Sequence, residues 1–331
     1  MAKYKVILAG CGGMSWAWIE YLRKREDVEI LAFVDIIIER AVLKNTSNNL
    51  SCAVFDDIRK ALAALPEANL VIDTTSPDAH ELIVTSALNA GKNVLGEKPM
   101  AETREQALNE IACADKAGKT YSVMQNRIYL PGMRTIRRNV DNGLLGRLGS
   151  ISSDFFIEVH FGGFRDLMDN VLVLDMAIHT FYQARFLIGE PSCTSVYCQE
   201  FNPPWSWYKG NASAVAIFEF DNGVVYDYRG SWCPKGHFDT SWECDWRIIG
   251  EKGTIKWEGS STPIARLDNG DEIKLGNTYN GKNGHEGCFD EMFAALEEGR
   301  AAETDSHRNY HAMNMVYGAI ESAKTGKKVL L

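Results

Sequence analysis

A glycine-rich turn directly after the first short apolar run is the feature that most constrains the fold of this chain. The apolar residues 6–9 lead straight into the turn, which consists of Gly10, Cys11, Gly12, Gly13, Met14 and Ser15. Such a turn after a buried strand presents backbone N–H groups and the N-terminus of the next helix to an anion, typically a pyrophosphate. The pattern therefore predicts a parallel α/β domain at the start of the chain.

Short apolar runs alternate with amphipathic segments over the first part of the chain. We expect buried strands at 6–9, 30–34, 70–73, 94–95 and 121–124. Helix-boundary signals lie between them: Pro77 suits a first helical position, Gly91 follows a helix, and Thr103 with Gln106 forms a capping box. This alternation predicts an N-terminal, doubly wound parallel sheet of Rossmann type in residues 1–125.

In residues 126–331 the hydrophobic pattern changes to longer segments in which apolar and polar residues alternate, as in strands. We expect a helix at 131–143 and strands at 148–161, 195–201, 212–220, 224–232, 244–249, 254–258 and 272–275. Asp221-Asn222-Gly223 and Asn269-Gly270 are hairpin signals. One helix is expected at 171–188, and two more at 288–298 and 306–325. The second domain is thus predicted as α+β, with a large, mostly antiparallel open sheet for substrate binding and oligomerisation.

Charge and cysteine placement exclude several classes of function. Lys and Arg number 35 against 44 Asp and Glu, which gives a formal net charge of -9 and argues against nucleic acid as a partner. The eight cysteines are scattered without zinc-ligand spacing, so we expect reduced thiols and no metal. No apolar stretch is long enough to be a signal sequence or to span a membrane. We expect a cytoplasmic protein.

The glycine turn and the strand that follows it predict a dinucleotide site. Gly10, Gly12, Gly13, Met14 and Ser15 would face the pyrophosphate, with Ser15 small enough at the third motif position for close helix packing. Asp35 lies 20 residues beyond Ser15, where a carboxylate accepts hydrogen bonds from the adenosine ribose, and Ile36 follows it. A carboxylate repels a 2′-phosphate, so NAD is favoured over NADP. The alternative is a tight turn and an N-cap aspartate without a ligand.

Thr74, Thr75 and Ser76 follow the strand expected at 70–73. They lie at the carboxyl edge of the sheet, where open α/β sheets bind ligands. Their hydroxyls are candidates for lining the cofactor. An ordinary capped helix start has the same sequence, so both interpretations remain open.

Two further stretches carry groups suited to chemistry. Glu97-Lys98-Pro99 follows the strand expected at 94–95, and Pro99 restricts the backbone of Lys98 to an extended conformation. Asp175 and His179 are four residues apart on an expected helix, so they share one face. A surface lysine in a loop and a buried histidine satisfied by a neighbouring aspartate are the plain structural alternatives.

The glycine turn, Glu97-Lys98-Pro99 and Leu174-Asp175-x-x-x-His179 together resemble the glucose-fructose oxidoreductase/inositol dehydrogenase/MocA (Gfo/Idh/MocA) family. The likeness spans nearly the whole chain, including Gly146-Arg147-Leu148-Gly149 and the ending Lys324-x-Gly326-Lys327. The resemblance implies an NAD(P)-dependent dehydrogenase of sugars, cyclitols or related polyols. It also implies a Rossmann domain, a C-terminal open sheet, and a homodimer or homotetramer in which sheets pack together.

The resemblance makes Lys98, Asp175 and His179 the catalytic group, with Glu97 and Lys98 also bordering the nicotinamide ribose. Oxidation of a secondary alcohol needs a base for the hydroxyl proton, and an imidazole titrates near neutral pH. We expect His179 to take the proton, Asp175 to orient the imidazole, and Lys98 to hydrogen-bond the substrate oxygen. Lys98 is the alternative base if burial favours its neutral amine.

Polar side chains near the catalytic helix are the candidates for holding a polyol. They are Arg127, Glu158, His160, Arg165, Asp169, Asn170 and His179. Asp169-Asn170-Val171 departs from the Gly-Gly run that is frequent in the family at this place, and Asn170 is equally suited to cap the helix. The aromatic residues Trp205, Trp207 and Tyr208 could stack on a sugar ring, although aromatics on strands more often fill sheet cores.

Three functions remain open from the sequence. The leading one is an NAD-dependent dehydrogenase that oxidises a secondary hydroxyl of a sugar, an inositol-like cyclitol or a sugar derivative. The second is an NAD-dependent glycosidase that uses transient oxidation and releases no NADH. The third is a dinucleotide-binding regulator without enzymatic activity. The presence of Lys98, Asp175 and His179 weighs against the third, because a pure sensor needs no proton acceptor.

Overall fold

The computed structural model describes residues 2–331, whose contacts divide them into two compact units. Unit 1 contains the chain through Gln125 together with His285–Tyr310. Unit 2 contains Asn126–Gly284 together with His311–Leu331. The segment His285–Tyr310 therefore folds with the N-terminal part of the chain, a return that no local sequence signal indicates.

Unit 1 is built on a parallel sheet with the strand order β3-β2-β1-β4-β5-β6. The strands are β1 (Tyr4–Ala9), β2 (Val28–Val34), β3 (Ala53–Phe55), β4 (Leu70–Asp73), β5 (Asn93–Gly96) and β6 (Tyr121–Val123). The expected doubly wound sheet is confirmed. The order reverses between β1 and β4, so the carboxyl ends of these two strands flank the place where such sheets bind ligands. Only the short, partly exposed β3 was not predicted.

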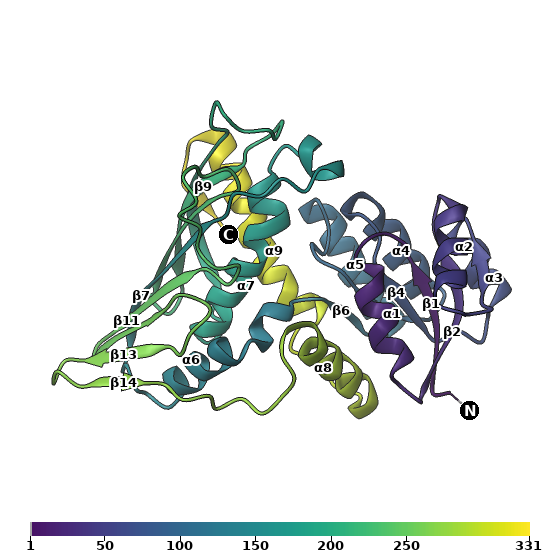
Figure 1. The fold of residues 1–331 in the computed structure, drawn as a ribbon, viewed down its shortest axis with the longest axis horizontal. Helices are drawn as coiled ribbons and strands as arrows, with labels where there is room; N and C mark the ends of the chain where they lie inside the picture. Colours follow the sequence, from purple (N-terminus) through teal and green to yellow (C-terminus); the bar gives the residue numbers. More distant parts are fainter. Residues whose placement is uncertain (1) are drawn as a thin grey trace. The chain divides into compact units, whose positions relative to one another are not determined.

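The helices of unit 1 cover its sheet (Figure 1). They are α1 (Ser15–Arg23), α2 (Ile38–Ser47), α3 (Ile58–Ala64), α4 (Pro77–Asn89), α5 (Arg104–Ala117) and α8 (Gly284–Glu298). Thr103 and Gln106 form the expected capping box at the start of α5. The ring of Phe289 on α8 lies 4.6 Å from that of Trp18 and 4.5 Å from that of Tyr21 on α1. Aromatic packing thus attaches α8 to α1.

Glu110 on α5 is a carboxyl group inside the core of unit 1, and its residue is fully buried. Burial raises the pKa of Glu110 to about 9; the negative charge of Asp73 adds to this effect, and the hydroxyl group of Tyr121 opposes it. A buried carboxyl group avoids ionisation because the low-dielectric interior stabilises the charged form poorly. Glu110 is therefore protonated in the folded protein at neutral pH.

Replacing Glu110 by glutamine is expected to stabilise the protein increasingly as the pH rises. An unfolded glutamate ionises near its ordinary pKa of 4.5, whereas the folded one stays protonated to about pH 9. The stability of the parent protein therefore falls between these values, and glutamine removes this loss. At pH 8 the free energy of unfolding should rise on the order of 5 kcal/mol. Urea unfolding at pH 5 and pH 8 measures it; an equal gain at both pH values would contradict the assignment.

Unit 2 is built on a sheet with the strand order β14-β13-β12-β11-β7-β10-β9-β8-β15. The strands are β7 (Leu148–Phe156), β8 (Cys193–Phe201), β9 (Ser213–Phe220), β10 (Val225–Ser231), β11 (Asp245–Gly250), β12 (Gly253–Trp257), β13 (Ile264–Leu267), β14 (Glu272–Lys274) and β15 (Val329–Leu330). Only β7 and β10 pair in parallel among these described strands. The expected, mostly antiparallel sheet is confirmed, but β7 ends at Phe156 instead of extending to residue 161.

One face of this sheet is covered by helices (Figure 1). The helical segments assigned to unit 2 wholly or in part are η1 (Asn126–Tyr129), α6 (Pro131–Asp141), η2 (Gly163–Leu167), η3 (Val171–Ala177), α7 (Ile178–Leu187) and α9 (Ser306–Thr325). Phe181 on α7 packs its ring 4.7 Å from Phe218 and 5.3 Å from Tyr228 on the sheet. This packing holds the segment η3–α7, which carries Asp175 and His179, against the strands. Across residues 2–331, every helix falls short of the length or apolar character that a bilayer-spanning segment requires.

Candidate active site

The glycine turn of unit 1 packs against the end of β4 through Gly10. Gly10 has a φ of +89°, and a Cβ atom there would lie 2.4 Å from the backbone carbon of Thr74. The hydroxyl of Thr74 donates to the Gly10 carbonyl at 2.5 Å and to the Ala9 carbonyl at 3.2 Å. Only glycine combines this φ with so close a backbone approach, so the sequence is constrained here by the fold itself.

The rest of the turn is open. Cβ atoms at Gly12 and Gly13 would meet nothing within 4 Å. The Ser15 hydroxyl donates to the Gly12 carbonyl at 2.7 Å and fixes the start of α1, whose first turn contains no acidic residue. Met14 lies at the exposed tip of the turn. An uncovered backbone at a helix N-terminus fits a pyrophosphate, as the sequence predicts.

Asp35 connects this turn to the next helix. Its residue is buried at the end of β2, with Oδ2 accepting from the Cys11 N–H at 2.9 Å and Oδ1 from the Ile37 N–H at 2.9 Å. The neighbouring Ile36 is almost fully exposed. Each carboxylate oxygen has a second lone pair, so Asp35 can hold the turn and still accept hydrogen bonds from a ribose.

The hydroxyls of Thr74 and Thr75 serve the protein's own structure. Thr74 bonds the glycine turn, and the Thr75 hydroxyl donates to Asp73 Oδ1 at 2.6 Å. Ser76, in contrast, is exposed and does not cap α4 with its side chain. Of the three hydroxyls proposed to line a cofactor, that of Ser76 is the most accessible.

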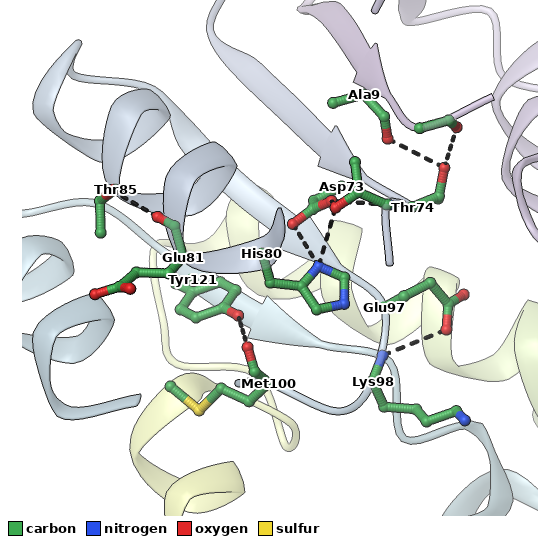
Figure 2. A network of polar contacts seen from close by, with 12 residues as sticks. Ala9, Asp73, Thr74, His80, Glu81, Thr85, Glu97, Lys98, Met100 and Tyr121 are labelled. Atoms are coloured by element: carbon green, nitrogen blue, oxygen red, sulfur yellow. Dashed lines mark hydrogen bonds and ion pairs between the residues drawn. The ribbon is translucent and has the colours of Figure 1, made fainter. Parts of the chain in front are cut away.

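Glu97 and Lys98 lie just beyond β5 (Figure 2). Glu97 is buried, and its Oε1 accepts from the Trp18 indole N–H at 2.7 Å. Its Oε2 accepts from the backbone N–H of Lys98 at 3.4 Å, and the following Lys98–Pro99 peptide bond is cis. Glu97 is therefore anchored inside unit 1, while the half-buried Lys98 continues from it at the carboxyl edge of the sheet.

Asp175 of unit 2 is paired with Arg165. The guanidinium Nε donates to Asp175 Oδ2 at 2.7 Å, and Nη2 donates to Oδ1 at 3.3 Å. The Asp175 side chain is almost completely buried, while that of Arg165 is about one quarter exposed, at 26%. A two-point contact of this kind fixes the orientation of the carboxylate. The sequence placed Arg165 among the substrate candidates but gave no sign of this pair.

The helix expected at 171–188 is not a regular α-helix. Residues Val171–Ala177 form a π-helix, and an α-helix follows at Ile178–Leu187. Asp175 lies in the π-helix and His179 in the α-helix that follows it. Their spacing of four residues therefore does not place them on one face of a regular α-helix, as was expected from the sequence. Both residues are buried. Single-turn π segments often occur at functional sites.

The remaining substrate candidates of unit 2 contact other side chains or the backbone. Glu158 pairs with Lys235, and His160 Nε2 lies 2.9 Å from Asp166 Oδ2. Arg127 donates through Nη1 to the Trp242 carbonyl, and its Nη2 lies 3.6 Å from the sulfur of Met176. Arg127 is thereby placed beside the residue that follows Asp175.

Asn170 does not cap the helix with its side chain, which corrects one of the two interpretations of this residue. Its Nδ2 donates instead to Glu200 Oε2 at 2.8 Å. Burial raises the pKa of Glu200 to about 7, and the bond from Asn170 opposes the rise. Asn170 therefore links the start of the π-helix to a carboxyl group that titrates near neutral pH.

Replacing Arg165 by glutamine is expected to lower the free energy of unfolding by about 1–3 kcal/mol, because Asp175 loses a charged partner. This loss is smaller than the usual cost of breaking a fully buried pair, because Arg165 is partly exposed to solvent. Urea unfolding measures the change. Arg229→Gln is the matched control, because the exposed Arg229–Asp154 pair should contribute about 1 kcal/mol or less. If both variants lost the same free energy of unfolding, the buried Arg165–Asp175 pair would contribute no more to stability than the exposed pair.

The strand order of unit 1, its open glycine turn and the acidic residue that follows β2 define a Rossmann-type dinucleotide-binding domain. The model of the oxidoreductase family with an NAD-binding Rossmann fold, Gfo/Idh/MocA, matches residues 4–125. The model of the Gfo/Idh/MocA C-terminal domain matches residues 133–256. The chain therefore belongs to the Gfo/Idh/MocA family of oxidoreductases, and the family resemblance seen in the sequence is confirmed.

Individual relatives agree with this assignment. The uncharacterized protein y4oX of Sinorhizobium fredii is 25% identical over 98% of this chain and 95% of its own length. The D-xylose dehydrogenase of Paenarthrobacter nicotinovorans is 27% identical, over 53% of this chain and 50% of its own length. An oxidoreductase from Agrobacterium radiobacter, solved with NAD+, L-tartaric acid and magnesium, has the same fold: its TM-score is 0.89 at 19% identity, with 99% of this chain and 98% of that chain covered.

Proposed function

We propose that this oxidoreductase is an NAD-dependent dehydrogenase that oxidises a secondary hydroxyl of a sugar, a cyclitol or a sugar derivative. The observation that carries the proposal is the segment η3–α7, which holds a buried imidazole and an arginine-paired carboxylate in a protein of an NAD-binding family. Oxidation of an alcohol needs a hydride acceptor and a base. NAD supplies the hydride acceptor when it is bound.

The residues proposed for the cofactor are those of the open turn and the strand ends in unit 1. The turn from Gly10 to Ser15 would hold the pyrophosphate, and Asp35 would accept from the adenosine ribose. Ser76 and Glu97 are proposed further along the same sheet edge. The buried carboxylate of Asp35 disfavours a 2′-phosphate, which makes NADP the less favoured cofactor.

We assign the proton chemistry to Lys98, Asp175 and His179. The imidazole of His179 takes the hydroxyl proton of the substrate, and Asp175 stabilises the imidazolium that forms. The fixed contact from Arg165 keeps the Asp175 carboxylate in one orientation during this step. The amine of Lys98 hydrogen-bonds the substrate oxygen as negative charge develops on it.

The proposed substrate class is supported by the relatives and by the polar side chains of unit 2. The matching region of D-xylose dehydrogenase belongs to an enzyme named for a sugar. Arg127, Glu158, His160 and Asn170 remain the proposed contacts for substrate hydroxyls. In this structure these side chains bond a backbone carbonyl and three side chains, which shows that each has a hydrogen-bonding group directed at a polar partner.

The test is a screen of monosaccharides, inositols and sugar acids for reduction of NAD. The absorbance of the reduced nicotinamide measures this reduction. A dehydrogenase accumulates NADH in proportion to substrate consumed. Substrate cleavage without net NADH would favour an NAD-dependent glycosidase. Tight NAD binding without turnover of any compound would favour a regulator, and either result would overturn the proposal.

We also propose a homodimer or homotetramer that associates through the helix-free face of the unit 2 sheet. Alternate residues on that face are apolar yet exposed, namely Tyr197, Val215, Ile217 and Val225. Contiguous exposed apolar surface is typical of association sites. Light scattering of the purified protein measures the subunit number, and a monomer at micromolar concentration would contradict this proposal.

A further inference from the structure

Asp73, the last residue of β4, places a carboxylate in the fully buried interior of unit 1. Its Oδ1 accepts from the Thr75 N–H at 3.0 Å and from the Thr75 hydroxyl at 2.6 Å. Its Oδ2 lies 2.8 Å from Nδ1 of His80 on α4 (Figure 2). A buried carboxylate is costly unless it is paired and hydrogen-bonded, and these contacts meet that requirement. No motif in the sequence points to a role for Asp73 or His80.

His80 has a second ring nitrogen that this network does not use. Nε2 is buried and has no hydrogen-bond partner within residues 2–331. Figure 2 shows it on the side of the ring that faces Glu97 and Lys98, away from Asp73. The negative charge of Glu97 contributes to raising the pKa of His80. The ring therefore lies between the Asp73 carboxylate and the segment that carries Lys98.

The charges around His80 favour an imidazolium. Burial lowers the pKa of His80, but the charge and hydrogen bond of Asp73 outweigh it and raise the value overall. Glu97 from the end of β5 and Asp78 from α4 act in the same direction. Glu102 also faces His80, and Glu110 on α5 faces Asp73. In its protonated form the ring carries a hydrogen on each nitrogen, and the Nε2–H end then presents positive charge toward Glu97.

We propose that His80, oriented by Asp73 and Thr75, is a positioning residue that holds Glu97 and thereby places the Lys98 amine for catalysis. Glu97 is fixed from one side by the Trp18 indole, and the backbone runs from it directly into Lys98. The positive end of the His80–Asp73 pair restrains the same carboxylate from the side of β4. This inference rests on the proposed role of Lys98 in alcohol oxidation.

Two conservative variants separate positioning from simple space filling. In His80→Asn the amide nitrogen stands at the place of Nδ1, so the bond to Asp73 is kept and the Nε2 end is lost. In His80→Gln the amide nitrogen stands at the place of Nε2, so an N–H donor still faces Glu97, although without the charge of an imidazolium. Glu81→Gln, on the next residue of α4, is the control, because Glu81 contacts the side chain of Asn109 and not this network.

We expect His80→Asn to lower kcat for NAD reduction tenfold or more, with the KM for the alcohol substrate changed less than threefold. His80→Gln should keep kcat within about threefold of the parent, and Glu81→Gln should match the parent. Unchanged kcat in His80→Asn would overturn the proposal. So would equal losses in His80→Asn and His80→Gln, because the side chain would then serve packing alone.

A spectroscopic measurement tests the proposed interaction between His80 and Glu97 without catalysis. The ¹⁵N chemical shifts of the His80 ring, assigned by correlation to its own backbone, report the state of Nε2. Glu97→Gln should move the Nε2 resonance and its titration, while Glu81→Gln should leave both unchanged. An Nε2 chemical shift that stays the same in Glu97→Gln would refute the inference even if the protein reduces NAD. A shifted signal would support the interaction between His80 and Glu97 even if no alcohol in the screen is oxidised.

Discussion

Replacing His179 by asparagine should lower kcat for alcohol oxidation by about 10²–10⁴-fold, the usual contribution of a general base. Asparagine fills part of the same buried site but cannot take up a proton near neutral pH. The affinity for NAD should stay within about threefold, because His179 belongs to unit 2 and the proposed dinucleotide residues belong to unit 1. Steady-state kinetics and titration with NAD measure the two quantities separately.

The matched control is His237→Asn. His237 is exposed in unit 2 and has a φ of +57°, a conformation that asparagine adopts readily. This variant removes an imidazole without touching the proposed site, so its kcat should equal that of the parent. A His179→Asn enzyme with the turnover of His237→Asn would remove His179 from the mechanism. If Lys98→Met abolished activity while His179→Asn kept it, we would assign the role of base to Lys98.

Most of the fold could be predicted because unit 1 obeys local rules. The apolar runs, the proline at the start of α4 and the capping box of α5 each act over a few residues, and the structure confirms them. The end of β7 and the strand β15 were missed, since their partners lie far away in the sequence. The four-residue strand β13 was also missed, although its partners β12 and β14 are its neighbours in the sequence. The return of α8 to unit 1 likewise depends on aromatic packing with Trp18 and Tyr21.

The candidate site shows the same division. Glycines, Asp35 and Glu97-Lys98-Pro99 stand at strand ends, so their placement at the sheet edge follows from the strand pattern. The strand pattern does not predict the Arg165–Asp175 and Asp73–His80 pairs. Each pair depends on side-chain geometry that only the tertiary structure determines. A weak signal existed for the second pair: Asp73 ends an otherwise apolar strand, and a buried charge there requires a partner. The π-helix left no recognisable mark in the sequence.

Replacing Gly10 by alanine should lower the free energy of unfolding by about 2–5 kcal/mol. A non-glycine residue at a φ of +89° is strained. The new methyl group would also lie 2.4 Å from the Thr74 carbon and 2.5 Å from the Thr75 nitrogen, which are backbone atoms held by the sheet. Relief of this overlap would move the turn away from β4 and break the Thr74 hydroxyl bond to Gly10. Urea unfolding without cofactor measures the loss.

The variant Gly12→Ala separates the stability of the turn from its proposed role in binding NAD. A Cβ atom at Gly12 meets nothing within 4 Å, so this variant should unfold like the parent. If the turn holds a pyrophosphate, the added methyl group occupies the space that the phosphates need, and the Kd for NAD should rise roughly tenfold or more, about 1.4 kcal/mol of binding free energy. Gly10→Ala would then lose stability first and affinity as a consequence, whereas Gly12→Ala would lose affinity alone. Unchanged NAD binding in a stable Gly12→Ala protein would mean that the open side of the turn faces solvent and not the dinucleotide.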